Sequence, residues 1–161
     1  MKLYMKQKLF TFKDQFTIYD EQGQAAYYVE GEIFTFGKKL HVYDINNHEV
    51  AFIQQKVLTF LPRFFVYVEN EQVAEIVREF TFFKPKYSIE GLHWSITGDI
   101  FQHEYRIDQD EHPIVSIHKA WMRFADTYEI DIKEERATIY ALAVVLAIDC
   151  VEALEASTQN I

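Results

Sequence analysis

The amino-acid sequence predicts a mainly β protein, in which about twelve strands form a closed barrel around one hydrophobic C-terminal α-helix. An apolar run, ATIYALAVVLAI, occupies residues 137–148, and helix-forming residues continue to about 155. Before this run, apolar and polar residues alternate with a period of two in many short segments. A helix that is apolar on every side must be enclosed, and a wide barrel of strands can enclose one.

The N-terminal half of the chain contains a weak hairpin repeat. Residues 16–19 (FTIY) lead through the turn DEQG to residues 26–29 (AYYV). Similar hairpins begin at residues 40 and 64, so that the three copies start 24 residues apart. A fourth hairpin is predicted within residues 105–117, and the segment 108–111 (DQDE) is expected to be its turn. That segment resembles a calcium loop only superficially, because the central Gly and the final Glu are missing.

Further short strands complete the predicted barrel. They are expected at residues 32–36, 80–83, 87–89, 94–97 and 126–132, with Gly or Pro at most of the boundaries. With the N-terminal segment, the total is about twelve strands, followed by a central helix over about residues 135–155. The chain shows no linker or low-complexity run, so residues 1–161 are expected to form a single domain.

Charge and composition exclude several classes of protein. The net charge of −9 disfavours nucleic-acid binding, although residues 1–13 carry four lysines and no acid. Those lysines suit a solvated edge strand, or alternatively a contact with phosphate or lipid head groups. The single cysteine, Cys150, excludes an internal disulfide. The apolar run is too short for a comfortable membrane span of about twenty residues, and no signal sequence is evident. We therefore expect a cytoplasmic protein without stable membrane insertion.

Three phrases of the sequence resemble the LURP-one-related family. They are residues 16–20 (FTIYD), 126–130 (DTYEI) and 142–149 (LAVVLAID), and the resemblance covers roughly residues 3–155. It implies the tubby C-terminal-like fold, a twelve-stranded barrel around a hydrophobic C-terminal helix. Distant relatives with this fold are the tubby proteins, which bind phosphoinositides, and the phospholipid scramblases. Most members of the family are uncharacterised, and none of the three phrases is a catalytic signature.

No catalytic or metal-binding motif is found in the sequence. Nucleophile elbows, P-loops, Cys–His signatures and Gly-rich dinucleotide loops are all absent, so no enzymatic activity and no cofactor are expected. None of the six histidines has helical i, i+4 or tight ligand spacing, so no metal site is predicted; they are His41, His48, His93, His103, His112 and His118. Asp149 follows the apolar run, and its carboxylate is expected at the barrel mouth, near water or a backbone donor. The alternative, a catalytic acid, would need a second titratable group nearby.

The candidate ligand-binding residues are Lys119, Trp121 and Arg123, within the segment HKAWMRF. Their alternate spacing would place all three on one face of an extended strand. An aromatic ring between two cations suits a ligand with anionic and apolar parts. The alternative is an ordinary strand that packs Trp121 into the core.

Two classes of function follow from these expectations. The first is a non-enzymatic binding or scaffold module for a lipid-like or protein ligand, as the family resemblance implies. The second is a membrane phospholipid-binding or scramblase-like protein, favoured by the apolar helix and the basic N-terminus and opposed by the net charge of −9. An enzyme with an unrecognised site is a third alternative, which the absence of catalytic motifs disfavours.

Overall fold

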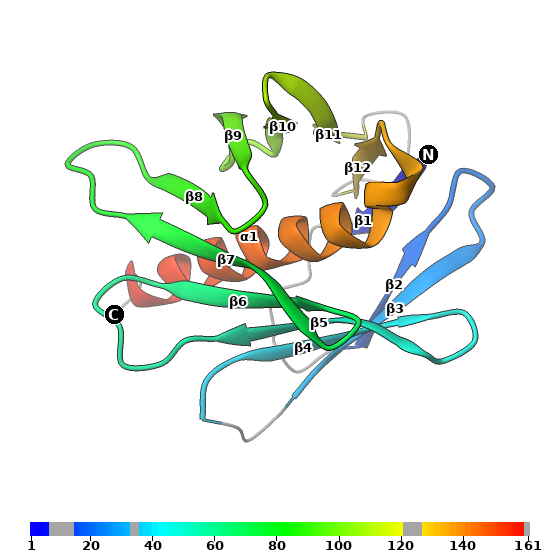
Figure 1. Ribbon diagram of the computed structural model, residues 1–161, viewed down its shortest axis with the longest axis horizontal. Helices are drawn as coiled ribbons and strands as arrows, with labels where there is room; N and C mark the ends of the chain where they lie inside the picture. Colours follow the sequence, from blue (N-terminus) through cyan, green and yellow to red (C-terminus); the bar gives the residue numbers. More distant parts are fainter. Residues whose placement is uncertain (7–14, 33–35, 121–126, 160–161) are drawn as a thin grey trace.

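The computed structural model describes residues 1–6, 15–32, 36–120 and 127–159, excluding the side chains of 158 and 159 (Figure 1). This part of the chain forms twelve strands, one short 3-10 turn and one α-helix. The strands are β1 (Lys2–Lys6), β2 (Gln15–Tyr19), β3 (Ala25–Gly31), β4 (Lys39–Asp44), β5 (Glu49–Gln55), β6 (Arg63–Val68), β7 (Glu71–Glu79), β8 (Lys86–Glu90), β9 (Trp94–Asp99), β10 (Glu104–Gln109), β11 (His112–Lys119) and β12 (Thr127–Ile132). The 3-10 turn (Glu135–Ala137) leads directly into the helix α1 (Thr138–Gln159).

All strands belong to one antiparallel sheet, in the order β8-β7-β6-β5-β4-β3-β2-β1-β12-β11-β10-β9. The pairing of β1 with β12 joins the two halves of the sheet, with Lys2 opposite Asp131 and Lys6 opposite Thr127. Within the described residues, β8 and β9 are not joined by a ladder and form the two edges of the sheet. The barrel is therefore nearly closed, with a seam between β8 and β9. The predicted strand number and fold class are confirmed.

The helix α1 runs through the middle of the curved sheet (Figure 1). Every residue from 141 to 151 is buried, and the inward-facing side chains of the strands surround them, among them Ile18, Val29, Val42, Ile53, Val66 and Ile76. By length and composition the segment Glu135–Ser157 is apolar enough to cross a membrane, but 72% of its apolar stretch is buried inside the barrel. The enclosure expected from its all-round apolar sequence is confirmed.

The hairpin repeat is visible in the turns that connect its strands. The Oδ1 atom of Asp20 accepts hydrogen bonds from the backbone N–H groups of Gln22 and Gln24, at 2.9 and 2.8 Å. The Oδ1 atom of Asp44 does the same for residues 46 and 48, at 2.8 and 2.9 Å. Aspartate stabilises such turns by replacing a backbone acceptor, which explains why it recurs at the equivalent position 24 residues later.

Residues 80–83 do not form the strand that their apolar sequence predicts. Glu79 already pairs with Lys86 across the β7–β8 hairpin, so residues 80–85 form the loop of that hairpin. The predicted strand at residues 32–36 begins after the end of β3, and residues 33–35 lie outside the described part of the chain.

Successive connections alternate between the two ends of the barrel because all neighbouring strands are antiparallel. The connections β3–β4, β5–β6, β7–β8 and β9–β10 lie at one end, which we call the loop end. The turns β2–β3, β4–β5, β6–β7 and β10–β11 lie at the other, which we call the hairpin end. The helix starts at the hairpin end and finishes at the loop end, where Figure 1 marks the C-terminus.

Candidate functional site

The structure leaves the predicted ligand-binding residues untested. Lys119 is the last residue of β11, and its backbone N–H donates a hydrogen bond of 3.0 Å to the Oε1 atom of Glu104. Trp121 and Arg123 lie outside the described residues. The proposed grouping of these three side chains therefore stays a prediction. Two other features of the described chain have the properties of a site.

The first feature is an apolar rim at the loop end. We define the loop rim as residues 36–39, 56–63, 80–86 and 99–104, which belong to the connections β3–β4, β5–β6, β7–β8 and β9–β10 in the described part of the chain. Leu58, Phe60 and Phe83 are 94%, 93% and 98% exposed. The full set of exposed large apolar side chains on the rim is Phe36, Leu58, Phe60, Phe80, Phe82, Phe83 and Phe101. Exposed apolar side chains concentrated in one region of a soluble protein typically mark an interaction surface.

The connections of the loop rim are held beside one another. The backbone N–H of Gln55 donates to the carbonyl of Lys38 at 2.8 Å, which links the first connection to the second. The N–H of Arg78 donates to the carbonyl of Pro62 at 3.1 Å, which links the second to the third. The third and fourth connections share an open hollow of about 620 Å³, lined by residues 83–85 and 98–102. The rim is therefore one continuous arc.

Side chains also anchor the end of the helix to this arc. The guanidinium Nε of Arg78 donates to the Oε1 atom of Glu155 at 2.6 Å, and the hydroxyl of Tyr87 donates to Oε2 at 2.5 Å. Arg78 additionally bonds the carbonyl of Glu79 at the start of the β7–β8 loop. Two of these contacts end on Glu155 of the helix, and the third lies at the end of β7. The loop that carries Phe82 and Phe83 therefore starts from a strand that is tied to α1.

Charge is distributed unevenly between the two ends. The segments 36–39, 56–63 and 80–86 of the loop rim contain no acid and six cations: Lys38, Lys39, Lys56, Arg63, Lys84 and Lys86. The fourth segment, 99–104, carries two acids, Asp99 and Glu104, and no Lys or Arg. The four turns β2–β3, β4–β5, β6–β7 and β10–β11 of the hairpin end contain no Lys or Arg and eight acids: Asp20, Glu21, Asp44, Glu49, Glu69, Glu71, Asp110 and Glu111. The connection from β12 to α1 at the same end adds two cations and two acids, Lys133, Glu134, Glu135 and Arg136. Several rim cations form ion pairs with carboxylates on the strands behind them, for example Lys86 with Glu79 at 3.3 Å. The excess of negative charge therefore lies away from the loop rim.

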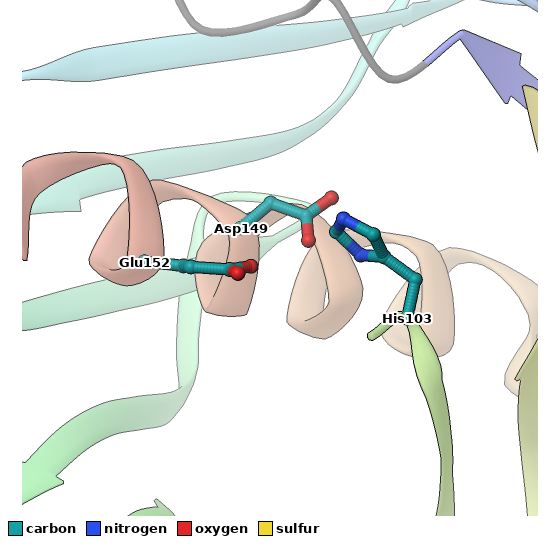
Figure 2. Close-up of side chains that lie close together, drawn as sticks. All are labelled: His103, Asp149 and Glu152. Atoms are coloured by element: carbon teal, nitrogen blue, oxygen red, sulfur yellow. The ribbon is translucent and has the colours of Figure 1, made fainter. Parts of the chain in front are cut away.

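The second feature is a polar cluster buried beside the helix (Figure 2). His103, Asp149 and Glu152 bring one potential ligand atom each to within 4.8 Å of the others. Asp149 and Glu152 are three residues apart on α1 and therefore share one face of the helix. His103 comes from the β9–β10 connection, and Figure 2 shows its ring directed at the carboxylate of Asp149.

The surroundings of His103 hold its ring in place. Its backbone has a φ of 52°, in the left-handed region where histidine is enriched, and its N–H donates to the carbonyl of Ile100 at 3.0 Å. The imidazole stacks on the ring of Tyr128, with centroids 4.9 Å apart and planes inclined by 6°. The side chain is buried, with only 4% of the residue exposed.

Burial decides the protonation of this cluster. It raises the pKa of Asp149 to about 8, against the opposing effect of a hydrogen bond from the Tyr128 hydroxyl. It also raises the pKa of Glu152 to about 7, to which the nearby Glu155 and Asp99 carboxylates contribute. Burial lowers the pKa of His103. In the absence of a bound cation, the cluster therefore favours neutral side chains.

The structure corrects the expectation for Asp149. The residue is only 1% exposed, so its carboxylate does not reach the barrel mouth. Among the described residues, its side-chain partner is the hydroxyl of Tyr128, which donates a hydrogen bond to Oδ2. The expectation was wrong because the helix remains enclosed beyond Ile148, through Val151. The sequence did mark Asp149 and Glu152 as polar residues at the end of an apolar run, but no local spacing pointed to His103.

The fold and the buried helix define the structural class of the protein, which is an antiparallel β-barrel with a hydrophobic helix as its core. The model of the LURP-one-related family matches residues 1–149, and the chain belongs to this family. The family resemblance found in the sequence is thus confirmed.

One relative supports the assignment, and one solved structure shares the fold. The chain is 35% identical over 151 residues to the uncharacterized protein YxjI of Bacillus subtilis (strain 168), covering 94% of this chain and 93% of that protein. The X-ray structure of the Arabidopsis thaliana protein AT5G01750 is similar, with a TM-score of 0.61 and coverage of 92% of this chain and 90% of that one. At 15% identity, this second similarity concerns the fold alone.

Proposed function

We propose that the protein is a non-enzymatic binding module whose loop rim docks on an anionic phospholipid surface. The observation that carries this proposal is the combination of exposed aromatic and basic residues at one end of the barrel with acidic turns at the other. The contact would be peripheral, because the apolar helix is enclosed as the core of the barrel.

The aromatic side chains would supply the apolar part of the binding energy. Transfer of a fully exposed Phe side chain out of water is worth about 1.5–3 kcal/mol when burial is complete. Phe60, Phe82 and Phe83 project from loops, with little of their surface covered by the protein. A few such side chains inserted among lipid head groups would suffice for reversible attachment.

The basic side chains would supply orientation and selectivity for anionic lipid. Each Lys or Arg close to an anionic leaflet contributes about 1 kcal/mol. The net charge of −9 does not prevent this, because charges are screened beyond about 8 Å at physiological ionic strength. The acidic turns lie at the opposite end, so an approaching membrane would meet the loop rim first.

A non-enzymatic role is supported by the placement of the titratable cluster. His103 and Asp149 are 4% and 1% exposed. Groups so deeply enclosed do not present a reacting atom to a substrate in solution, which general acid–base catalysis requires.

Flotation with vesicles tests the proposal. We expect the protein to float with phosphatidylserine–phosphatidylcholine vesicles at low salt and to remain unbound with phosphatidylcholine alone. The double substitution Phe82→Ser/Phe83→Ser should weaken binding by about tenfold or more, since each lost side chain removes on the order of 1.5 kcal/mol. The matched control is Ile45→Ser, because Ile45 is 65% exposed on a turn of the hairpin end.

A charge reversal separates lipid docking from general hydrophobic adhesion. Lys84→Glu on the rim should weaken binding to the anionic vesicles, whereas Lys133→Glu, which changes the net charge equally at the opposite end, should leave it unchanged. No recovery with anionic vesicles, or recovery unaffected by the rim substitutions, would contradict the proposal.

A further inference from the structure

We propose that His103, Asp149 and Glu152 form a binding site for one divalent first-row transition cation, of the Zn²⁺ or Mn²⁺ type, with a structural role. The ion would join the β9–β10 connection to the central helix. This inference is independent of the membrane proposal, because none of the three side chains contributes to the apolar surface of the loop rim.

The geometry of the three donors fits a single ion. Zinc lies about 2.0–2.2 Å from imidazole nitrogen and carboxylate oxygen. Two ligands of one tetrahedral ion are therefore about 3.3 Å apart, and two on opposite sides of an octahedral ion about 4.3 Å apart. The donor atoms of this cluster already lie within 4.8 Å of one another. Small side-chain rotations would bring all three into contact with the ion.

Unpartnered polar atoms are the second, independent observation. The Nδ1 atom of His103 and the Oδ1 atom of Asp149 are buried and have no hydrogen-bond partner among the described residues. Buried polar atoms of a folded protein are nearly always satisfied, and exceptions require an explanation such as an ion. The other oxygen of Asp149 accepts a hydrogen bond of 2.5 Å from the Tyr128 hydroxyl. This bond would orient the carboxylate, as such outer contacts do in metal sites.

Charge balance favours a cation at the same place. Two carboxyl groups lie close together here, and no Lys or Arg of the described chain forms an ion pair with either of them. A divalent ion would compensate both carboxylates at once.

The donor set indicates the kind of ion. Calcium and magnesium prefer sites made of oxygen alone, and soft ions such as Cu(I) prefer sulfur. One imidazole with two carboxylates suits zinc, manganese or iron(II).

The neighbourhood of His41 shows why proximity alone is insufficient. Its ring also lies between two carboxylates, but its two nitrogens are already bonded to Glu32 and Glu49, at 2.7 and 2.9 Å. That ring has no nitrogen left for an ion, in contrast to His103.

The location suggests what a bound ion would stabilise. Strand β9 is an edge of the sheet, next to the seam that no described ladder closes. An ion held by His103 and α1 would fasten this edge to the core. Three protein donors leave at least one coordination position to a small ligand such as water. Because His103 and Asp149 are buried, that position would not be open to a substrate in solution, and a structural role is proposed.

The test uses the full-length chain after treatment with EDTA and removal of the chelator. Titration with ZnCl₂ and MnCl₂, followed by calorimetry, should show one saturable site per chain. The melting temperature should rise by several degrees on saturation with the preferred ion, because an ion that binds only the folded state stabilises it.

Three conservative variants examine the ligands. His103→Asn, which tolerates the positive φ, Asp149→Asn and Glu152→Gln should each weaken binding by tenfold or more. In EDTA, Glu152→Gln should melt at or above the temperature of the unsubstituted protein, since it removes a poorly solvated carboxyl group. The expected signature is thus a variant that is folded and stable but no longer stabilised by the ion.

The control is His48→Asn, because His48 is an exposed histidine 3.4 Å from a carboxylate oxygen of Asp44. Its ion binding should equal that of the unsubstituted protein. The proposal is overturned by the absence of saturable binding, by binding that survives the substitution of Glu152, or by binding lost in the His48 variant. The last outcome would indicate an adventitious ion only.

Discussion

The hydroxyl of Tyr128 donates a hydrogen bond of 2.5 Å to the Oδ2 atom of Asp149, and this bond joins the last strand to the central helix inside the barrel. Both side chains are buried. Burial raises the pKa of the Tyr128 hydroxyl well above its ordinary value, with the Asp149 carboxyl adding to the effect, so the phenol keeps its proton. The two residues belong to two of the phrases through which the sequence resembles its family, and the fold brings these phrases into contact.

Removal of this bond should destabilise the barrel. Tyr128→Phe is expected to lower the free energy of unfolding by about 1–3 kcal/mol, because Asp149 loses its hydrogen-bond donor inside the core. Tyr105→Phe is the matched control, since the Tyr105 hydroxyl is buried without a partner in the described structure. Its removal should be nearly neutral. Urea unfolding in EDTA measures both, and equal losses would contradict the assigned role of the bond.

Truncation of a core side chain tests the enclosure of the helix. Leu146 is 1% exposed, and Leu146→Ala should cost about 2–5 kcal/mol through lost contacts and a residual cavity. Leu58→Ala removes the same atoms from a residue that is 94% exposed, and it should change stability by less than about 0.5 kcal/mol. Denaturant unfolding compares the two. A small effect of Leu146→Ala would be inconsistent with a helix packed on all sides.

Gly98 is required by the backbone of the β9–β10 hairpin. It has a φ of 118°, and an added Cβ would lie 2.6 Å from the carbonyl oxygen of Glu104 and 2.8 Å from the Cα of Tyr105. Gly23 has a φ of 77° but open space around the same position. Gly23→Ala should therefore cost about 1–2 kcal/mol from the dihedral angle alone, and Gly98→Ala should cost more. Thermal melts of the two variants check the order, and the reverse order would refute this explanation.

His41 should make stability depend on pH. Its burial lowers the pKa, but hydrogen bonds to Glu32 and Glu49 outweigh this effect, and the net result is a pKa above the ordinary value. Because the folded-state pKa is the higher one, the stabilisation is complete below about pH 6.5, the unfolded value. It is lost as the pH rises through the folded-state pKa. Because His41 and its two carboxylate partners are partly exposed to solvent, their contribution to the free energy of unfolding should stay within about 1 kcal/mol.

Urea unfolding at about pH 6 and at about pH 8.5 measures this pH dependence, because the two values lie on either side of the ordinary pKa of histidine. His41→Gln should reduce the difference in stability between the two conditions. His112→Gln is the control, because His112 is exposed and its Nδ1 contacts only the backbone carbonyl of Asp110 among its described partners. An unchanged pH dependence in the His41 variant would show that the carboxylates do not hold the ring charged.

Features determined by local sequence could be predicted before the structure was known. The apolar run at residues 137–148 indicated a buried helix, because a side chain on every face was apolar. The turn segment DEQG after residue 19 indicated where the first hairpin reverses, and the structure shows that the Asp20 carboxylate bonds to the backbone there. The number of strands follows from the same short-range patterns.

Local sequence patterns did not predict the structure correctly where a segment's conformation depends on the strand or helix that it packs against. Residues 80–83 have the composition of a strand, yet they form a loop because the hairpin has already turned between Glu79 and Lys86. Asp149 was expected to mark the point where the helix leaves the barrel, but the helix stays buried beyond the apolar run, through Val151. In both cases the error concerns the position of an element relative to its neighbours.

The sequence by itself determined a barrel of strands around an apolar helix, because alternation and helical periodicity depend only on neighbouring residues. The tertiary structure alone decided that His103 meets Asp149 and Glu152, and that four separate loops place their aromatic side chains on one rim. Those encounters depend on the order and direction of the strands in the sheet, which bring distant segments to the same end of the barrel.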